Sequence, residues 1–259
     1  MTAALQIAGA SVVYRSRGRG EVHAVDGVEL EVDRGEIVGL VGESGSGKSS
    51  LARAVVGLER LHAGSITLDG VPVAPLGWRT RADVRTQMVF QSPYASLNPR
   101  RTVGSQLRDG VPSGRGDLTS AVAGLLERVG LEASAAARYP HQFSGGQRQR
   151  IAIARALAPR PEILVADEPV TALDASAQAQ VVELLGSLVR DLGVGMLFIS
   201  HDLALVRHIA DRVAVMYHGQ IVEQGQTEQV WRDRAHPYTR ELIAAVPRLG
   251  AARRGGERS

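Results

Sequence analysis

With 259 residues, the chain is long enough for one large α/β domain or two small ones. Its 44% hydrophobic and 22% charged residues are typical of a soluble globular protein, and no apolar run approaches the roughly 18 residues that span a bilayer. The absence of cysteine excludes disulfides, thiolate zinc sites and cysteine-ligated iron–sulfur clusters, and a formal net charge of +3 is too small to argue for a nucleic-acid partner.

The N-terminal part of the chain predicts a β layer that leads into a buried strand. Its first residues lack the basic region and long apolar segment of a signal peptide, so we expect a cytosolic protein. Two alternating segments are typical of half-buried strands and flank a Gly/Arg turn: 5–13 and 22–32, with the turn at 16–20. Residues 37–41 are continuously apolar, as in a parallel strand buried on both faces. A Gly-rich loop, a helix at 48–57 and a strand at 64–71 with an Asp-Gly turn follow.

The rest of the chain predicts a helical insertion and then an alternation of strands and helices. Between residues 92 and 143 we expect two helical stretches, near 102–109 and 117–130, joined by a loop at 109–114. The later elements are predicted in order as a helix at 145–158, a strand at 163–166, a helix at 175–192, a strand at 196–200, a helix at 202–211, strands at 213–217 and 220–224, and helices near 227–232 and 237–245. This pattern indicates a single α/β core that carries a helical subdomain.

A phosphate-binding loop follows the first buried strand. Residues 42–49 (GESGSGKS) match the pattern GxxxxGK[ST] between a strand and a helix, the context in which that pattern cradles phosphates. Backbone N–H groups and the helix N-terminus would face the phosphate oxygens, Lys48 would reach the β- and γ-phosphates, and the Ser49 hydroxyl would ligate Mg²⁺. The residues expected to hold the nucleotide here are Gly42, Ser44, Gly45, Ser46, Gly47, Lys48, Ser49 and Ser50.

Two carboxylates and a histidine follow later buried strands. Asp167 ends the apolar strand at 163–166, and in a P-loop enzyme this first acid holds Mg²⁺. The next residue, Glu168, is placed to orient and deprotonate the attacking water. Because parallel strands end on one side of a sheet, His201, beyond the strand at 196–200, is expected to face the same site and to sense the γ-phosphate.

The segment at 143–150 (FSGGQRQR) indicates which class of P-loop enzyme the chain resembles. It resembles the signature motif of ATP-binding-cassette (ABC) ATPases and precedes a helix, as in that family. Ser144, Gly145 and Gly146, with Gln147, would form a second phosphate-binding helix N-terminus. The resemblance implies a head-to-tail dimer, in which this motif of one subunit closes over the nucleotide held by the loop of the other. It covers nearly the whole chain, up to about residue 249.

The same resemblance implies three further site residues. Gln91 resembles the Q-loop glutamine, which senses Mg²⁺ and water beside the contact with membrane subunits. Asp174 resembles the last residue of the D-loop at the dimer interface, and Tyr14 the aromatic residue that stacks on adenine. The departures are small: Phe143 opens the signature where Leu is commoner, and Ala166 is a small last residue in its strand. Neither departure removes a functional group.

A narrower resemblance concerns importers of peptides. Three segments are similar to the ATP-binding subunits of oligopeptide and dipeptide importers, a subfamily that also includes nickel and glutathione importers: 94–100 (YASLNPR), 139–141 (YPH) and 236–239 (HPYT). We interpret His236 as part of a turn rather than a metal ligand, with Pro237 at the first position of a helix. Since one of the two ATPases in such importers often carries a cysteine cluster, the cysteine-free chain is expected to be the other.

The expected fold is therefore an α/β P-loop NTPase core, a mixed sheet flanked by helices, with an antiparallel β layer and a helical subdomain. We expect the core at 1–91 and 144–249, the helical subdomain at 92–143 and a disordered basic tail at 250–259. The resemblance implies a peripheral protein on the cytoplasmic face of the membrane that hydrolyses ATP with Mg²⁺ to drive di- or oligopeptide import. Its implied partners are two transmembrane permease subunits, a second and different ABC ATPase, and indirectly an extracytoplasmic solute-binding protein, but no nucleic acid.

Other functions stay open at this point. The solute could be nickel or another small molecule, and the transporter could be an exporter. A soluble ABC ATPase acting on nucleic acid or ribosomes would usually carry coiled-coil insertions or tandem cassettes, and the sequence shows neither. A catalytically silent nucleotide-binding regulator would not need Glu168 and His201, which are present.

Overall fold

The computed structural model describes residues 4–16, 20–75, 84–112 and 117–245. The tail predicted at 250–259 and most of the turn predicted at 16–20 lie outside these residues. Among the described residues, no helix is both long enough and apolar enough to cross a membrane.

A six-stranded sheet forms the centre of the molecule. Its strands, in spatial order, are β10 (Gln220–Gln226), β9 (Arg212–Tyr217), β3 (Ile37–Val41), β8 (Gly195–Ile199), β7 (Ile163–Asp167) and β6 (Thr86–Val89). All neighbours pair in parallel except β10, which runs antiparallel to β9. Every residue of β3 and β8 is buried, as their continuous apolar sequences predict for strands covered on both faces.

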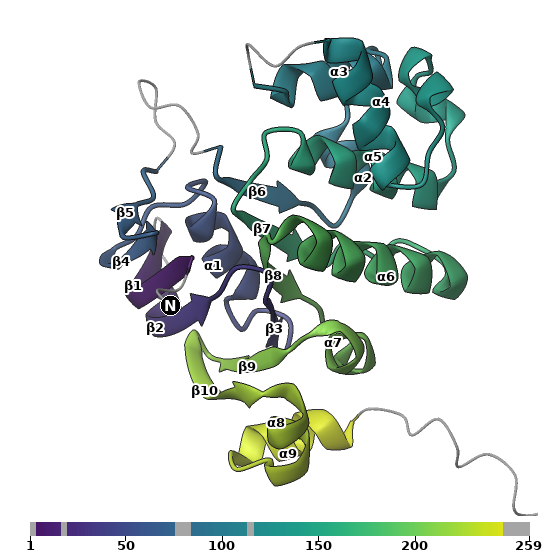
Figure 1. Ribbon diagram of the computed structural model, residues 1–259. Coiled ribbons are helices and arrows are strands. Elements are labelled where there is room, and N and C mark those ends of the chain that lie inside the picture. Colours follow the sequence, from purple (N-terminus) through teal and green to yellow (C-terminus); the bar gives the residue numbers. More distant parts are fainter. Residues whose placement is uncertain (1–3, 17–19, 76–83, 113–116, 246–259) are drawn as a thin grey trace, which may run out of the picture.

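A second, antiparallel sheet covers one side of the central sheet. Its order is β2 (Gly20–Val32), β1 (Leu5–Ser16), β4 (Ala63–Leu68) and β5 (Val71–Pro72). Helix α1 (Lys48–Val55) lies between the two sheets, and its buried residues share one hydrophobic cluster with strands of both (Figure 1). The predicted Asp-Gly turn is confirmed, because Asp69 and Gly70 both have positive φ angles, 46° and 77°, between β4 and β5.

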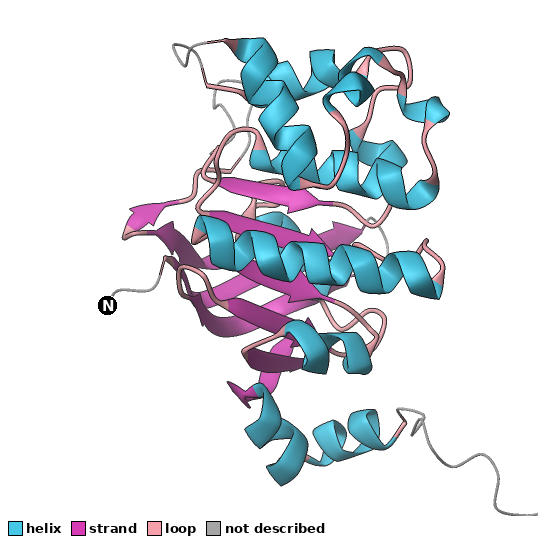
Figure 2. Ribbon diagram, turned by 45° about the vertical axis from the view of Figure 1, so that its right-hand side comes forward, coloured by secondary structure: helices cyan, strands magenta, loops and turns pink. Residues whose placement is uncertain are grey.

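Helices cover the other face. Figure 2 shows α6 (Ala175–Leu192) lying along the sheet, and α5 (Gly145–Leu157) and α7 (Leu203–Ile209) pack on the same side. Between β6 and α5, the regular elements of the described residues are all helical: α2 (Pro93–Ser96), α3 (Val103–Gly110), α4 (Leu118–Arg128), and the 3₁₀ turns η1 (Ala133–Ala137) and η2 (Pro140–Gln142). These helices gather at one end of the molecule, and α8 (Thr227–Asp233) and α9 (Pro237–Ala244) lie at the opposite end (Figure 1).

The described residues of the insertion share their hydrophobic core with the helical face of the central sheet. Leu107 of α3 and Leu126 of α4 are fully buried and belong to the same cluster as Ile151 of α5 and Phe198 of β8. Helix α5 therefore belongs to both regions and ties the insertion to the sheet. The exact boundaries at 92 and 143 stay a prediction.

Most elements begin and end within a few residues of the predicted positions, and the antiparallel first layer is confirmed. Strand β6 was not predicted. It has four residues, TQMV, lies at the edge of the sheet and buries only Thr86 and Val89 fully. Such a segment is too short and too polar to give either the alternating or the continuous apolar pattern of a strand.

Candidate active site

The phosphate-binding loop is shaped by its glycines. It connects β3 to α1, and Gly47 caps α1 in a left-handed conformation with φ 108°. A Cβ atom on Gly47 would lie 2.0 Å from the carbonyl oxygen of Ala24, and one on Gly42 would lie 2.1 Å from the carbonyl oxygen of Met216. Because both neighbours are main-chain atoms of packed strands, only glycine fits at these two positions.

Lys48 is buried against this loop. The residue is 6% exposed, and Nζ donates hydrogen bonds to the carbonyl oxygens of Gly42 and Glu43, both at 2.7 Å, and to Ser46 Oγ at 3.2 Å. Burial lowers the pKa of the Lys48 ammonium, while the charges of Glu168, Asp167 and Glu43 raise it. The ammonium is thus a preformed and poorly solvated charge that phosphate oxygens would complement.

Ser49 and Asp167 come together from α1 and the end of β7. The hydroxyl of Ser49 donates to Asp167 Oδ1 at 3.1 Å. Burial raises the pKa of Asp167, the hydrogen bond from Ser49 lowers it, and the neighbouring charge of Glu168 raises it further. Hydroxyl and carboxylate oxygens are ligands that Mg²⁺ prefers, and a cation here would offset the penalty on the ionised carboxylate. The residues present therefore fit the metal.

Glu168 directly follows the carboxyl end of β7 and has a strained backbone conformation. Its φ is 48°, which for a residue other than glycine costs on the order of 1–3 kcal/mol. Its N–H donates to the carbonyl oxygen of Ile199 at 2.9 Å, which fixes the strained backbone on β8. Strain of this kind collects where function requires a particular side-chain direction.

Three neighbouring parallel strands deliver the groups that surround the Glu168 carboxylate. Gln91 Nε2, beyond β6, donates to Oε2 at 3.3 Å, and His201 Nδ1, beyond β8, lies 3.4 Å from Oε1. The structure thus brings together the three residues predicted as catalytic. Thr171 Oγ1 also donates to Oε2, at 3.1 Å. This threonine was not predicted, because a Thr three residues after a carboxylate does not stand out in the sequence as a motif.

Tyr14 lies beside the first turn of α1. Its hydroxyl donates to Glu59 Oε2 at 3.1 Å and lies 3.2 Å from Ser50 Oγ. The residue is 36% exposed. The structure thus places Tyr14 and Ser50 together next to the phosphate-binding loop, with part of the tyrosine accessible to a ligand. Its role in adenine stacking stays a prediction.

The predicted signature segment lies at the start of α5, and its described surroundings do not include the phosphate-binding loop. Ser144 caps α5, its Oγ accepts from Gln147 N at 3.3 Å, and Gln147 Oε1 accepts from Ser144 N at 3.0 Å. Ser144 and Gly145 are exposed. A pocket of about 400 Å³ joins this segment to Ala172–Asp174, and of the described residues that line it none belongs to the phosphate-binding loop. Asp174 caps α6 by accepting from Ala177 N at 2.9 Å.

The C-terminal His-Pro-Tyr segment also reaches the site. His236 caps α9 with Pro237 at its start, as predicted, because His236 Nδ1 accepts from Tyr238 N at 3.2 Å. The described residues contain no group of three or more His, Cys, Asp or Glu side chains that could hold a metal ion. A different contact was not predicted: the hydroxyl of Tyr238 accepts from Glu43 N, within the phosphate-binding loop, at 2.8 Å.

The raised pKa of Asp167 gives a testable trade-off between stability and function. Since the folded-state pKa lies above the ordinary 3.8, the free energy of unfolding falls as the pH rises from 3.8 through the folded-state pKa, and it stays lower at neutral pH. Asp167→Asn removes this penalty. We expect a higher unfolding midpoint than that of the unaltered chain at pH 7 without nucleotide, with the difference shrinking as the pH approaches 4, measured by thermal unfolding.

The same variant should lose its response to magnesium. We expect the affinity for ATP in the presence of Mg²⁺ to fall by at least about 10- to 100-fold. Loss of a residue that only hydrogen-bonds to a metal ligand already has an effect of that size, and Asp167 is predicted to be a ligand itself. The check is the rise in unfolding midpoint on adding ATP with and without Mg²⁺. A lower midpoint at pH 7, or an undiminished rise with Mg²⁺-ATP, would contradict the roles given to Asp167.

Two family models match this chain. The ABC transporter model matches residues 25–171, and the model for the oligopeptide/dipeptide transporter C-terminal region matches residues 222–259. The chain is 50% identical over 250 residues to a putative peptide import ATP-binding protein of Brucella abortus (strain 2308), covering 93% of this chain and 74% of that protein. It is 49% identical to the oligopeptide transport ATP-binding protein OppD of Mycobacterium tuberculosis, covering 94% of this chain and 40% of OppD.

Similarity extends to other importers and to solved structures. The glutathione import ATP-binding protein GsiA of Salmonella choleraesuis is 50% identical over 88% of this chain and 37% of its own length. The dimeric ATP-binding cassette MJ0796, in a post-hydrolysis state bound to ADP and Pi, superposes with a TM-score of 0.72 at 27% identity, covering 86% of this chain and 98% of that chain. The structure of cbiO1 from Clostridium perfringens superposes with a TM-score of 0.78 at 26% identity, covering 96% and 98%.

Proposed function

We propose, since this chain belongs to the ABC transporter family of ATPases, that it energises an importer of dipeptides or oligopeptides. The observation that carries the proposal is the match of residues 222–259 to the C-terminal region of oligopeptide/dipeptide transporters, on a chain 50% identical to a putative peptide import ATP-binding protein. The ATPase assignment itself follows from the family and from the cassette solved with ADP and Pi. The choice of solute and the roles of individual residues are what we propose.

We assign nucleotide binding to the loop at 42–49 and the acid beside it. Lys48 exchanges its loop carbonyl partners for oxygens of the β- and γ-phosphates, which suits a buried ammonium already surrounded by acceptors. Ser49 and Asp167 would hold Mg²⁺, which when bound would neutralise the developing charge on the phosphate oxygens. Tyr14 contacts the adenine.

Hydrolysis depends on Glu168. Its carboxylate orients a water molecule and accepts its proton as the water oxygen bonds to the γ-phosphorus. The bond from that phosphorus to the β-phosphate oxygen breaks in the same step, and ADP leaves. Gln91 and Thr171 donate to one carboxylate oxygen and His201 lies beside the other, so these side chains fix its direction. The strained backbone at Glu168 supports this role, because it aims the side chain at the sheet edge where Lys48 and Asp167 lie.

We further propose a head-to-tail dimer with a second, different ABC ATPase. The exposed Ser144–Gln147 helix start is a ready anion site that, among the described residues, shares no pocket with the phosphate-binding loop of its own chain. Its partner is therefore the nucleotide on the other subunit, with Asp174 at the interface. ATP binding favours the closed dimer, and hydrolysis removes that preference.

The membrane partners would bind beside Gln91. A pocket of about 300 Å³ lies between β6 and helices α3 and α5, with Gln87, Phe90, Gln106 and Arg155 among its lining residues. Two permease subunits docked there would be moved when the dimer closes, and a solute-binding protein outside the cell would deliver the peptide to them. A second candidate solute is glutathione, because GsiA is 50% identical to this chain.

Uptake of labelled solutes tests this function. In cells that carry Glu168→Gln at the native locus, we expect uptake of dipeptides or oligopeptides to fall to background, while glutathione and nickel uptake stay unchanged. Glu162→Gln, at the other end of strand β7, is the matched control and should leave uptake unaltered. Loss of glutathione or nickel uptake alone would replace the peptide assignment with that solute.

A further inference from the structure

A buried tyrosine from the C-terminal helix contacts the phosphate-binding loop directly. Tyr238 is only 7% exposed, and its hydroxyl accepts from Glu43 N at 2.8 Å. Its ring packs against Tyr217 on β9, with 4.1 Å between the ring centroids. Burial raises the pKa of Tyr238, so the phenol stays neutral at physiological pH. The contact thus consists of a neutral oxygen held in a fixed place beside the second residue of the loop.

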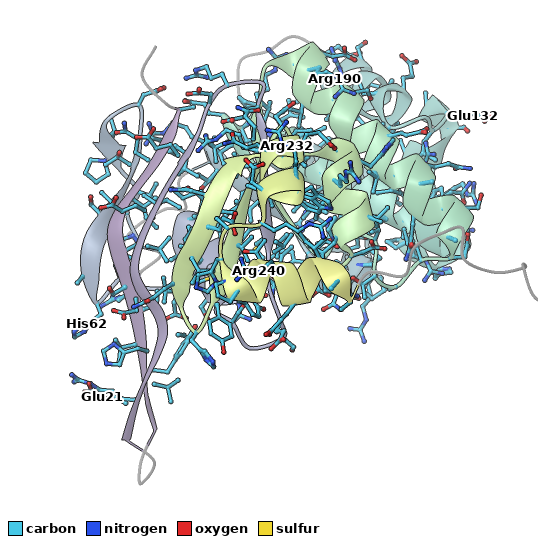
Figure 3. The ribbon with its side chains drawn as sticks, turned by 90° about the horizontal axis from the view of Figure 1, so that it is seen from below. Glu21, His62, Glu132, Arg190, Arg232 and Arg240 are labelled. Carbon is cyan, nitrogen blue, oxygen red and sulfur yellow. The ribbon has the colours of Figure 1, made fainter. Side chains whose placement is uncertain are left out.

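The start of α9 is anchored to the central sheet. Glu223 on β10 accepts from Ala235 N at 2.9 Å and from His236 N at 3.0 Å. Arg240 Nη1 donates to the carbonyl oxygen of Ala235 at 2.9 Å. Figure 3 labels Arg240 on α9 and views the molecule from the side of this helix. Because β10 pairs with β9, and β9 pairs with β3, Tyr238 and the loop that follows β3 are held by the same sheet.

The peptide group that Tyr238 contacts is also the one that holds Lys48. The N–H of Glu43 and the carbonyl of Gly42 belong to one planar trans peptide unit and point in opposite directions. Lys48 Nζ donates to that carbonyl at 2.7 Å, and Tyr238 accepts from that N–H. Rotation of this peptide unit would therefore break both hydrogen bonds at once. The tyrosine hydroxyl sets the orientation of the carbonyl and, through it, the position of the ammonium.

We propose that Tyr238 is a positioning residue for ATP binding, through which the C-terminal helix holds the phosphate-binding loop in the shape that receives the β- and γ-phosphates. When Lys48 turns from the loop carbonyls to the phosphates, the Gly42–Glu43 peptide loses one of its two restraints, and Tyr238 supplies the other. The inference rests on the phosphate-binding role proposed for Lys48.

Tyr238→Phe in the full-length chain removes only the hydroxyl. We expect the KM for Mg²⁺-ATP to rise by about 3- to 10-fold, the range that loss of one buried hydrogen bond gives. The kcat should stay within about twofold, because Glu168 and its partners are untouched. Tyr217→Phe, which removes the hydroxyl from the adjacent ring, is the matched control and should leave KM unaltered. In the described part of the chain, Tyr217 makes no hydrogen bond to the loop.

Lys48→Ala separates this proposal from the one it rests on. If Lys48→Ala binds ATP as the unaltered chain does, the phosphate-binding role of the lysine is wrong whatever Tyr238 does. If Lys48→Ala loses binding and Tyr238→Phe keeps its KM within about 1.5-fold, the positioning role of Tyr238 is wrong. A Tyr238→Phe protein with a lower kcat and a lower unfolding midpoint but an unchanged KM would also overturn the positioning role, because that result indicates a packing role alone.

Discussion

Glu168→Gln is expected to lower steady-state ATP hydrolysis by about 10²- to 10⁴-fold, the range attributed to a general base. Glutamine has nearly the same shape, so Gln91 and Thr171 can still contact its amide oxygen, and the strained backbone stays held by Ile199. It cannot accept the proton of the attacking water. The measurement is kcat at saturating Mg²⁺-ATP, with ATP affinity followed in parallel and expected to change little.

The same substitution should trap an ATP-bound dimer, because the state that ATP favours can no longer be left by hydrolysis. Light scattering after gel filtration of the variant mixed with its partner ATPase in Mg²⁺-ATP would detect this dimer as a species with the summed mass of the two chains. Glu162→Gln is again the control, since it neutralises a carboxylate at the far end of the same strand, where Glu162 contacts Arg34. Normal turnover in Glu168→Gln would defeat the assignment of the base.

Gly47→Ala should abolish ATP binding and destabilise the fold. The added methyl would lie 2.0 Å from the Ala24 carbonyl oxygen and 2.8 Å from Met216 Cε, at a φ of 108°. Backbone strain of this kind costs about 1–3 kcal/mol, and overpacking adds about 1–3 kcal/mol. Because Gly47 caps α1, the loop must shift and the phosphate-facing N–H groups shift with it. Urea denaturation and ATP binding measure the two effects.

Gly27→Ala is the matched control for this change. Gly27 also has a positive φ, 64°, but a Cβ atom there would meet nothing within 4 Å. We therefore expect the strain cost alone, on the order of 1 kcal/mol, with ATP affinity unaltered. If Gly47→Ala were no less stable than Gly27→Ala and bound ATP normally, the close approach between the loop and β2 would not constrain the site.

Much of this fold could be predicted because its buried strands carry unbroken apolar runs. Ile37–Val41 and Gly195–Ile199 are covered on both faces, and their sequences show it. Strand β6 could not be predicted, because it is held by pairing with β7 rather than by its own residues. Register with a distant strand is a tertiary property that leaves no local pattern in a four-residue segment.

The candidate site also contains some residues whose positions the sequence could predict and one contact that it could not. Lys48, Asp167, Glu168 and His201 each follow a strand that the sequence reveals, so their convergence at one sheet edge could be expected. The Tyr238 contact could not, because it joins residues 195 positions apart through a helix whose location depends on Glu223. Even a correct assignment of every element leaves open which loop a helix N-terminus touches.

The order of strands in the central sheet has a consequence for biosynthesis. Strand β3, which leads into the phosphate-binding loop, pairs with β8 and β9, whose residues follow it by some 150 positions or more. At about 5–20 residues per second, the ribosome exposes these five apolar residues for roughly 8–30 s before either neighbour exists. During that interval the nascent chain has no formed nucleotide site, so ATP cannot stabilise it. ATP can therefore begin to stabilise the chain only after β8 and β9 have been synthesised and have paired with β3.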